Sequence, residues 1–366
     1  MRTPFLALIL SVAATASPLP STPTSTCKDI EIPITVSVPR FIINTTVNDN
    51  WDAATLTLNL TRRDFSTSAD PLPISGNLTS EVESTYVIGA TLCGTGGPML
   101  VLTHGIIESK FFVDAAIAAG YSVLNYDRIG VGSSSKSVTI KLSPSFEANA
   151  SNSLRVNSLS DAQFQVETAV LNSLIIYARQ TVNASQIALI GHSYGSYIST
   201  ASASQTAVEA VVLTGFSGTF TYFDPFLAGA GLRVANLRDP GRWSDLDSGY
   251  LTSSDLYAES YVYFAEPYFD HSVAEWAYRV ASEPFALGEL PSLLATDIDY
   301  GNITAPVLVL QGKYDVSACG GNCVGLLNAT KALFTGSEVV ETVDDLPAGY
   351  VCSSHLVRVM LTLTRL

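Results

Sequence analysis

The sequence predicts an α/β fold with a mainly parallel central sheet, and two patterns lead to this prediction. From about residue 84 onward, short continuous apolar runs alternate with stretches that have helical spacing. Strands that are covered on both faces have this continuous apolar character, which is typical of parallel sheets. The expected strands cover residues 86–92, 99–103, 121–126, 186–190, 208–214, 307–311 and 339–343.

Residues 111–119 and 161–180 have the spacing of helices, and Asp161 is placed to cap the second one. The chain has 366 residues, of which 47% are hydrophobic. It can therefore bury one large core, and its length favours about two domains. Disorder and a collagen-like fold are excluded.

The first 16 residues predict a secretory signal peptide. A charged Met1-Arg2 start and an apolar run over residues 5–12 precede Ala14-Thr15-Ala16, a small-residue cleavage site. A membrane anchor is the alternative, but the run is much shorter than the roughly 20 residues that a spanning helix needs. We therefore expect a secreted, extracellular protein with no membrane span.

Residues 17–83 form an N-terminal segment that we expect to be β-rich. Residues 17–26 are rich in Ser, Thr and Pro, which is typical of disorder, whereas residues 30–38 alternate apolar and polar positions as a half-buried strand does. The expected α/β core then covers residues 84–215 and 306–366.

Residues 216–305 interrupt the core pattern without a convincing core strand. They contain half of the 34 aromatic residues of the chain (15 Phe, 16 Tyr and 3 Trp). Most of these rings should form the core of a helical insertion, and some should face a ligand pocket, because such pockets are mainly apolar and aromatic. The pocket candidates are Phe220, Tyr222, Phe223, Tyr263 and Phe264.

Gly191-His192-Ser193-Tyr194-Gly195 has the pattern G-x-S-x-G and stands between an expected strand and a helix of small residues. In this context the pattern forms a sharp turn that exposes a nucleophilic serine. The alternative is a plain turn rich in Gly and Ser, which the flanking strand and helix disfavour. Ser193 is therefore the candidate nucleophile.

Three further segments extend this pattern over residues 84–366, which resemble the α/β-hydrolase family, in particular its secreted, fungal-type serine esterases and lipases. His104-Gly105-Ile106 is similar to the family's oxyanion loop, and residues 127–134 are similar to its D-x-x-G-x-G-x-S turn. Asp315 follows a late strand, as the family's catalytic acid does. The resemblance implies an α/β-hydrolase fold with residues 216–305 as a helical lid.

A serine hydroxyl needs a base, which in turn needs an acid to orient it. The resemblance gives His104 and His192 structural roles, and His271 indicates a solvated helix start. His355 follows the last strand run, where the family has its base, so Ser193, Asp315 and His355 form the expected triad in the order typical of this fold. Asp344 and Asp345 are rivals for the acid.

The resemblance assigns the oxyanion hole to the backbone N–H groups of Ile106 and Tyr194. Two positions depart from the family pattern. Ser196 stands where a second glycine is often found after the turn, and Ser354 precedes His355 where glycine is more usual. Neither departure removes a reactive group.

All five cysteines follow the signal peptide, so a secreted chain can form at most two disulfides. We expect Cys27–Cys93, and either Cys319–Cys323 or a bond from one of these two to Cys352. A zinc site at residues 319–323 is weakly indicated, because no matching second pair is present. We expect no metal. Seven N-glycosylation sequons also fit secretion, at Asn44, Asn59, Asn77, Asn149, Asn183, Asn302 and Asn328.

The formal charge of -14 argues against a nucleic-acid partner, since few cations are available for phosphates. No nucleotide or flavin motif is complete, so no cofactor is expected. The partner should be a small-molecule ester.

The first functional hypothesis is a serine hydrolase that cleaves carboxylic esters of a hydrophobic substrate through an acyl-enzyme. The alternatives are an acyltransferase or cyclase, or a tailoring hydrolase of a natural-product pathway, with the same triad. A peptidase would need a pocket for a peptide terminus, for which the sequence shows no mark. A non-catalytic binder would predict a broken triad.

Overall fold

The structure is a computed structural model that describes residues 27–61, 74–105, 111–140 and 152–350. Within these ranges the chain forms a ten-stranded sheet and a separate three-stranded sheet, together with twelve α-helices. None of the described helices is long and apolar enough to cross a membrane. The signal peptide, Asn149 and Cys352 lie outside the described residues.

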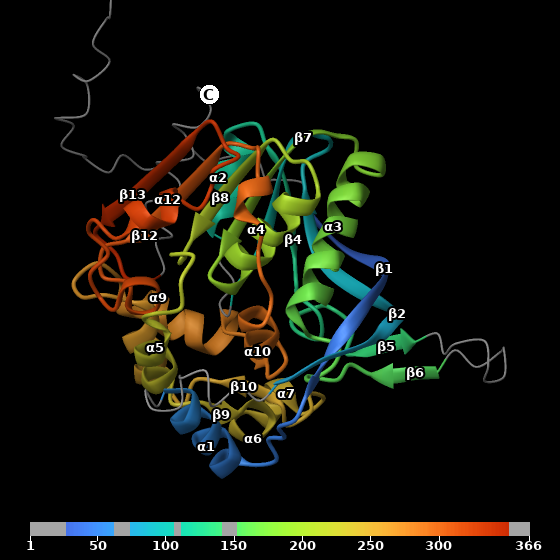
Figure 1. Cartoon of the computed structure of the whole chain (residues 1–366), viewed down its shortest axis with the longest axis vertical. Coiled ribbons are helices and arrows are strands. Elements are labelled where there is room, and N and C mark those ends of the chain that lie inside the picture. Colours follow the sequence, from blue (N-terminus) through green and yellow to red (C-terminus); the bar gives the residue numbers. More distant parts are fainter. Residues whose placement is uncertain (1–26, 62–73, 106–110, 141–151, 351–366) are drawn as a thin grey trace, which may run out of the picture.

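The large sheet has the strand order β13-β12-β8-β7-β3-β4-β2-β5-β6, with β1 paired to β2 (Figure 1). The neighbours from β13 to β4 pair in parallel, and the pairs that involve β1, β2, β5 and β6 are antiparallel. The predicted, mainly parallel sheet is therefore confirmed. Its strands are β1 (Cys27–Ile43), β2 (Ile74–Cys93), β3 (Gly97–Thr103), β4 (Ser122–Tyr126), β5 (Ser137–Ile140), β6 (Asn152–Arg155), β7 (Ala184–His192), β8 (Ala210–Thr214), β12 (Val307–Gly312) and β13 (Val340–Leu346).

The expected strand at 86–92 is part of β2 and runs antiparallel to its neighbours. The reason lies in the connection that follows it. Only residues 94–96 separate β2 from β3, whereas a parallel crossover needs a dozen or more residues. The chain must therefore reverse its direction between the two strands.

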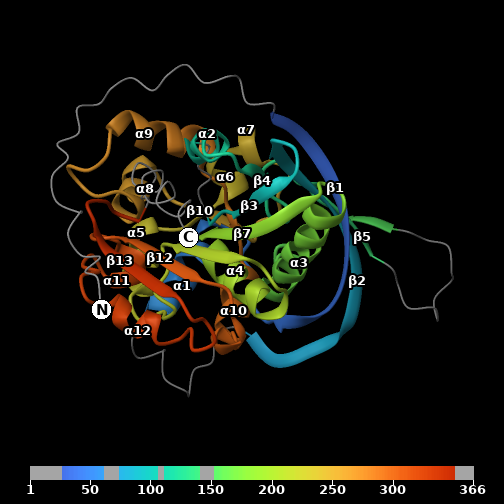
Figure 2. The same ribbon diagram turned by 90° about the horizontal axis from the view of Figure 1, so that it is seen from above.

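Helices cover both faces of the sheet (Figure 2). Successive side chains of a strand point to opposite faces, so each strand contributes apolar side chains to two cores. Met99 and Val101 of β3 belong to the core cluster that includes side chains of α3 (Phe164–Gln180) and α4 (Tyr194–Gln205). Leu100 and Leu102 belong to a second cluster with residues of α2 (Phe111–Ala118). The continuous apolar runs in the sequence thus serve two separate cores.

The long helix α3 begins three residues later than the sequence predicts, and Asp161 does not cap it. Its N-cap residue is Gln163, whose side chain makes no capping bond. Asp161 instead accepts hydrogen bonds from the Tyr86 hydroxyl at 3.0 Å and from the Asn157 backbone N–H at 2.8 Å. These partners bind the Asp161 carboxylate outside the helix, which explains why the capping prediction was wrong.

The N-terminal segment contains a helix as well as strands. Helix α1 (Asn50–Thr61) lies between β1 and β2, at the far end of the molecule from most of the sheet (Figure 1). Ala53 and Leu56 of α1 share a buried cluster with Phe226 and other residues of the insertion. The N-terminal segment therefore supports both the sheet and the insertion.

Residues 216–305 lie between β8 and β12 and fold beside α1, below the sheet in Figure 1. They contain short helices and a small antiparallel sheet with the order β11-β10-β9. The elements are α5 (Phe223–Ala230), β9 (Arg233–Val234), α6 (Ala235–Arg238), α7 (Pro240–Trp243), β10 (Tyr250–Thr252), α8 (Leu256–Tyr263), α9 (His271–Trp276), the π-helix η1 (Ala277–Ala281), β11 (Phe285–Ala286), α10 (Glu289–Leu294) and the 3₁₀-helix η2 (Tyr300–Asn302). After β12 come α11 (Val316–Cys319) and α12 (Leu327–Lys331).

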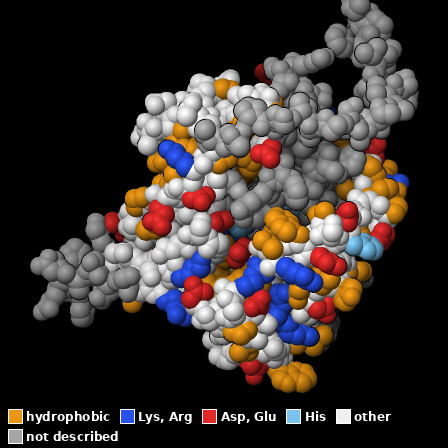
Figure 3. Space-filling view, turned by 180° about the vertical axis from the view of Figure 1, so that it is seen from behind, with side chains coloured by type: hydrophobic (Ala, Val, Ile, Leu, Met, Phe, Trp, Pro, Cys, Tyr) orange, Lys and Arg blue, Asp and Glu red, His pale blue; other side chains and the backbone are white. Residues whose placement is uncertain are grey.

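Charged side chains of both signs are interspersed on the face opposite to that of Figure 1, as Figure 3 shows. The asparagines of five sequons are exposed, at positions 44, 59, 183, 302 and 328.

The two disulfides of the structure join Cys27 to Cys93 and Cys319 to Cys323. Both are among the pairs that the sequence analysis considers, and the first of them links directly paired residues of β1 and β2.

Candidate active site

Ser193 occupies a sharp turn between β7 and α4. Its backbone has φ 57° and ψ −126°, a conformation that residues with a Cβ rarely adopt. Such backbone strain costs about 1–3 kcal/mol and persists only where the surrounding structure enforces it. Here the Ser193 N–H donates a hydrogen bond to the Thr214 carbonyl at the end of β8, with 2.8 Å between nitrogen and oxygen.

Two glycines allow this turn to pack closely. A Cβ atom on Gly195 would lie 2.1 Å from the carbonyl oxygen of Thr103, and one on Gly191 would lie 2.5 Å from the Cα of Ser196. Real Cβ atoms do not approach backbone atoms so closely, because their van der Waals spheres would overlap. The G-x-S-x-G pattern is therefore required by the packing of the turn against β3 and against its own helix.

The ends of the parallel strands bring the sequence-predicted residues to one edge of the sheet. Ser193 follows β7, Asp315 follows β12 and His104-Gly105 follows β3. Because these strands are parallel, their carboxyl ends lie at the same edge, where ligands of open α/β sheets bind. A Cβ on Gly105 would lie only 2.6 Å from the Ser193 Cβ, so the β3 loop touches the turn directly.

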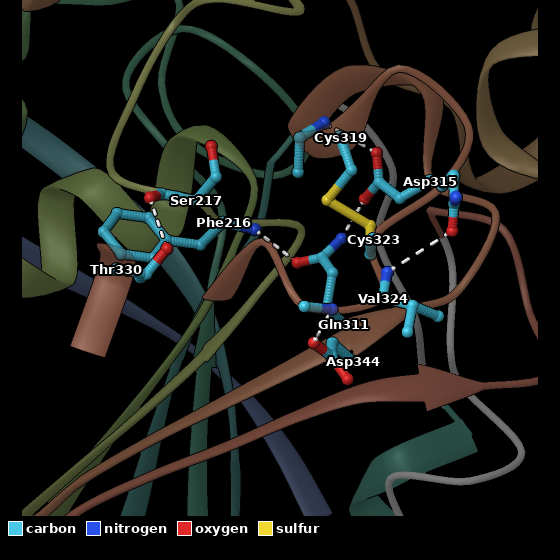
Figure 4. Close-up of a disulfide and its surroundings, with 12 residues drawn as sticks. Phe216, Ser217, Gln311, Asp315, Cys319, Cys323, Val324, Thr330 and Asp344 are labelled. Atoms are coloured by element: carbon cyan, nitrogen blue, oxygen red, sulfur yellow. Dashed lines mark hydrogen bonds between the residues drawn. A yellow bond between two sulfur atoms is a disulfide. The ribbon is translucent and has the colours of Figure 1, made fainter. Parts of the chain in front are cut away.

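Asp315 is fully buried and held by hydrogen bonds. Its Oδ1 accepts from the Ala318 backbone N–H at 2.8 Å, and its Oδ2 accepts from the Gln311 side-chain amide (Figure 4). Burial raises the pKa of Asp315 to about 7, and the hydrogen bonds from Ala318, Ser317 and Gln311 oppose this increase. A carboxyl with such a pKa is typical of functional sites.

The Cys319–Cys323 disulfide closes the loop that follows Asp315 (Figure 4). Within this loop the Gly321 N–H donates to the Asp315 carbonyl at 2.7 Å, and the Cys323 N–H donates to the Lys313 carbonyl at 2.9 Å. The ring of Tyr222 lies against Gly320. The disulfide and these bonds hold the backbone on both sides of Asp315.

The rival carboxylates belong to a different environment. Asp344 and Asp345 lie on β13, where Asp344 is half-buried and Asp345 is exposed. Asp344 accepts a hydrogen bond from the Gly325 backbone N–H at 2.7 Å. Their exposure favours Asp315 as the acid.

Three of the four histidines lie in the described part of the chain, and His355 does not. Nε2 of His104 accepts from the Arg128 backbone N–H at 3.1 Å, so its Nδ1 carries the proton and donates to the Gly105 carbonyl at 2.9 Å. Nδ1 of His192 is hydrogen-bonded to the hydroxyl oxygen of Thr214, with 2.8 Å between the two atoms. Burial lowers the pKa of both rings to about 4, so both are neutral at pH 7.

His271 is the first residue of α9 and is exposed, at 2.5 Å from the Glu266 carboxylate. This hydrogen bond raises the pKa of His271. The surface position agrees with the solvated helix start that the sequence indicates. His104 is bonded through both ring nitrogens, and His271 lies on the surface. His192 is bonded through Nδ1 only, and its buried Nε2 has no hydrogen-bond partner among the described residues.

Of the two expected oxyanion donors, Tyr194 is described and Ile106 is not. Tyr194 is the first residue of α4, and the first four N–H groups of a helix have no partner within the helix. Its backbone N–H follows the Ser193 turn directly and lies at the positive end of the helix.

A cavity opens at Ser193 and is lined mainly by apolar and aromatic side chains. Its volume is about 30 Å³, which is enough for about two water molecules. The lining comes from the serine turn, from residues beside Asp315 and from the insertion: Ser193, Tyr194, Tyr197, Gly215, Thr219, Phe220, Phe223, Phe226, Phe285, Glu289, Leu290, Leu293, Leu294, Ser317 and Ala318.

The five aromatic pocket candidates have different surroundings in the structure, and only some of them line a cavity. Phe220 and Phe223 line this cavity, and Tyr263 lines a second cavity that is described below. Tyr222 covers Gly320, and the ring of Phe264 stacks on that of Phe269 with 4.8 Å between the ring centroids. Phe226 and Phe285 line the main cavity without having been singled out, because periodicity does not show which insertion ring faces inward.

A buried ion cluster, which the sequence does not predict, lies beside the cavity. Nη1 of Arg128 lies 3.0 Å from the Glu167 carboxylate and 2.9 Å from that of Glu289, and all three side chains are buried. Nη2 of Arg128 donates to the Gly105 carbonyl at 3.2 Å, and its guanidinium lies over the Tyr194 ring. The D-x-x-G-x-G-x-S turn contains Arg128, but no motif marks the two glutamates.

Burial raises the pKa of Glu289 to about 8, although Arg128 lowers it. Glu289 is thus a carboxyl of the insertion that reaches both the cavity and the core.

Among the residues that the structure describes, no group of three or more His, Cys, Asp or Glu side chains is arranged to hold a metal ion.

The sequence profile of the alpha/beta hydrolase family matches residues 100–356, which is more than half of the chain. The chain belongs to the alpha/beta hydrolase family. The match includes Ser193 and Asp315 and also reaches His355 and Ile106. No curated protein matches the sequence.

Solved structures of the same fold are similar over most of their length. An esterase from Exiguobacterium antarcticum has a TM-score of 0.52 and 16% identity, and the match covers 77% of this chain and 96% of the esterase. A highly thermostable carboxyl esterase from Bacillus coagulans has a TM-score of 0.52 and 15% identity, with 76% and 94% covered. A thermophilic esterase from Thermogutta terrifontis has a TM-score of 0.51 and 15% identity, with 78% and 94% covered. At such low sequence identity, the similarity shows only that this chain has the same fold as these proteins.

Proposed function

We propose that this alpha/beta hydrolase is a secreted serine esterase that cleaves carboxylic esters of a hydrophobic substrate. The observation that carries the proposal is the strained Ser193 turn at the wall of an aromatic cavity. Asp315, buried at the same edge of the sheet, is the acid of the triad, and His355 is its base. The three similar structures are esterases, which supports the same class of substrate.

In the first half of the reaction, His355 takes the proton of the Ser193 hydroxyl while the oxygen attacks the ester carbonyl. The tetrahedral intermediate carries its negative charge on the former carbonyl oxygen, which the backbone N–H groups of Tyr194 and Ile106 bind. His355 then gives its proton to the leaving alcohol, and an acyl-enzyme remains. Asp315 stabilises the charged imidazole between these two steps.

In the second half, His355 takes a proton from a water molecule, which attacks the acyl-enzyme carbonyl. The same oxyanion donors bind the second intermediate. Ser193 then leaves with the proton from His355, and the carboxylic acid is released. If an alcohol replaces this water, the same enzyme becomes an acyltransferase, so product analysis separates the two activities.

The substrate is expected to be hydrophobic, because Phe220, Phe223, Phe226 and Phe285 of the insertion line the cavity. We assign residues 216–305 as a lid on this basis, between core segments 84–215 and 306–366. The cavity holds only about two water molecules. Substrate entry therefore requires the lid side chains to move.

Secretion is supported by three independent features. Residues 1–16 have the pattern of a signal peptide, and five sequon asparagines are exposed in the described chain. Two disulfides fit an oxidising compartment, whereas cytosolic thiols are kept reduced. Mass spectrometry of the secreted protein tests this part, and a mature N-terminus at Ser17 with N-glycans is the expected result.

The activity is tested with p-nitrophenyl esters from acetate to palmitate, using wild type and Ser193→Ala, both shown to be folded by circular dichroism. Wild type should release p-nitrophenol and the variant should not. Equal rates for the two proteins would refute the assignment of Ser193. Release of p-nitrophenol without free carboxylic acid, in the presence of an added alcohol, would instead show acyl transfer.

A further inference from the structure

A second cavity lies next to the one that contains Ser193. Its volume is about 10 Å³. It is lined by residues of the insertion, among them Phe226, Ser253, Glu259, Tyr263, Ser282 and Phe285. None of these residues belongs to the triad or the expected oxyanion hole.

Two rings separate this inner cavity from the main one. Phe226 and Phe285 appear in the lining of both cavities. Phe226 is held between the rings of Phe223, at 5.5 Å between centroids, and Tyr263, at 5.7 Å. Phe285 has no such ring partner among the described residues, and a ligand that reaches the inner cavity from Ser193 must displace the side chain of Phe285 or Phe226.

The inner cavity contains one carboxyl group in an otherwise mainly apolar lining. Glu259 of α8 is only 2% exposed. Its Oε2 accepts hydrogen bonds from the hydroxyls of Ser253 at 2.7 Å and Ser282 at 3.1 Å. Its Oε1 is buried without a hydrogen-bond partner among the described residues. An unsatisfied buried oxygen of a carboxyl is costly, so a partner for Oε1 is expected.

The chemistry of Glu259 selects the kind of partner. Burial raises the pKa of Glu259, whereas the two serines and then Arg238 and Arg242 lower it. A charged carboxylate accepts hydrogen bonds only, and a protonated one can also donate. A hydroxyl group both donates and accepts, so it fits either state of Glu259. A methyl group of similar size fits neither.

We propose that Glu259 forms a distal subsite that binds a hydroxyl group at the far end of the ester substrate, beyond Phe226 and Phe285. The substrate class is then an ester with an apolar, ring-bearing or chain segment that ends in an alcohol or phenol. The apolar segment lies along the aromatic wall, and the terminal hydroxyl bonds Oε1. The inference rests on the proposed esterase function, because the reacting ester must reach Ser193.

The test compares two p-nitrophenyl esters, 3-(4-hydroxyphenyl)propanoate and 3-(4-methylphenyl)propanoate. They differ only in the para substituent of the ring, which is a hydroxyl group in the first and a methyl group in the second. Wild type should have a kcat/KM at least tenfold higher for the hydroxyl ester. Glu259→Leu should abolish this preference or reverse it, and Glu259→Gln should reduce it at least threefold. Glu275→Gln, an exposed glutamate of α9, is the matched control and should keep the wild-type ratio.

A binding measurement separates this inference from the esterase proposal. Ser193→Ala is titrated by calorimetry with the corresponding alcohols, 3-(4-hydroxyphenyl)propan-1-ol and 3-(4-methylphenyl)propan-1-ol. At least tenfold tighter binding of the phenol supports the subsite even if no ester is cleaved. Equal binding of the two alcohols, or an unchanged ratio in a folded Glu259→Leu, would overturn it. The comparison within Ser193→Ala needs no Glu259 variant to fold.

If wild type cleaves p-nitrophenyl acetate but treats the two propanoates alike, the esterase proposal stands and the subsite is wrong. If wild type cleaves no ester but binds the phenol more tightly, the subsite stands and the esterase proposal fails. The failure of one proposal can therefore be distinguished from the failure of the other.

Discussion

Arg128 and Glu289 form a buried ion pair between the α/β core and the insertion, with 2.9 Å between Nη1 and Oε2. Arg128 belongs to the turn that follows β4, and Glu289 is the first residue of α10. The pair lies next to the cavity at Ser193, because Glu289 lines that cavity. The insertion is thus attached to the core by a charge contact at the candidate active site.

Arg128→Met should destabilise the protein much more than Glu289→Gln. Without Arg128, the carboxyls of Glu167 and Glu289 are buried beside each other with no cation, and loss of one partner of a buried pair costs about 3–5 kcal/mol. Glu289→Gln leaves Nη1 of Arg128 bonded to both carboxylate oxygens of Glu167, so the expected cost is about 1 kcal/mol. Urea unfolding of both variants measures the difference. Equal free energies of unfolding would contradict the pairing.

The free energy of unfolding should fall as the pH rises from about 4.5 to about 8. Burial raises the pKa of Glu289 in the folded protein to about 8, from 4.5. Between these values the folded state binds more protons than the unfolded chain, so increasing pH favours unfolding, by at most about 1.4 kcal/mol per pH unit for one group. Urea unfolding at several pH values should show a smaller slope for Glu289→Gln than for wild type. An identical slope would show that Glu289 does not titrate in this range.

The two disulfides should differ in what they stabilise. Cys27–Cys93 closes a long loop, and its loss through Cys27→Ser and Cys93→Ser should cost about 4 kcal/mol of unfolding free energy. Cys319–Cys323 closes a short loop, for which the same relation gives about 2 kcal/mol.

Activity should follow the opposite order, because Cys319–Cys323 closes the loop that follows Asp315. The double variant Cys319→Ser and Cys323→Ser should lose at least about tenfold in kcat/KM for p-nitrophenyl acetate, since a displacement of about 1 Å at a catalytic group can cost about a hundredfold. Wild-type kinetics in that variant would show that the loop holds Asp315 without its disulfide.

Phe223→Ala should shift the ester preference to longer acyl chains. Phe223 lines the cavity at Ser193, and the loss of its phenyl ring leaves more than enough space for an acyl chain that is longer by about two methylene groups. Each buried methylene contributes about 0.8 kcal/mol, so kcat/KM for the longer ester should rise about tenfold. The p-nitrophenyl ester series measures the shift. Tyr257→Ala, an exposed position of α8, is the control, and a shift in both variants would contradict a specific pocket.

The sequence predicted the features that depend on local patterns. The sheet followed from continuous apolar runs such as residues 99–103, whose alternate side chains enter two cores. The Ser193 turn followed from glycines at 191 and 195, because close packing leaves no room for a Cβ there. These signals lie within a few neighbouring residues, so a single sequence contains them.

Features that depend on distant residues were not predictable in the same way. Arg128, Glu167 and Glu289 are far apart in the sequence and meet only in the folded chain. Helix α1 was not predicted, because its composition is as polar as that of the segment around it. Its buried side chains pack against the distant insertion, so no local pattern indicates them. The Glu259 cavity was missed for the same reason, since Ser253 and Ser282 join it only through tertiary structure.

The proposed esterase function requires Ser193 to be an activated nucleophile. The most direct test of this requirement is the reaction of the purified protein with a fluorophosphonate, followed by intact-mass and peptide mass spectrometry. We predict one adduct per chain, located on Ser193 and absent from folded Ser193→Ala. A folded wild-type protein without an adduct, or with an adduct on another residue, would contradict the claim.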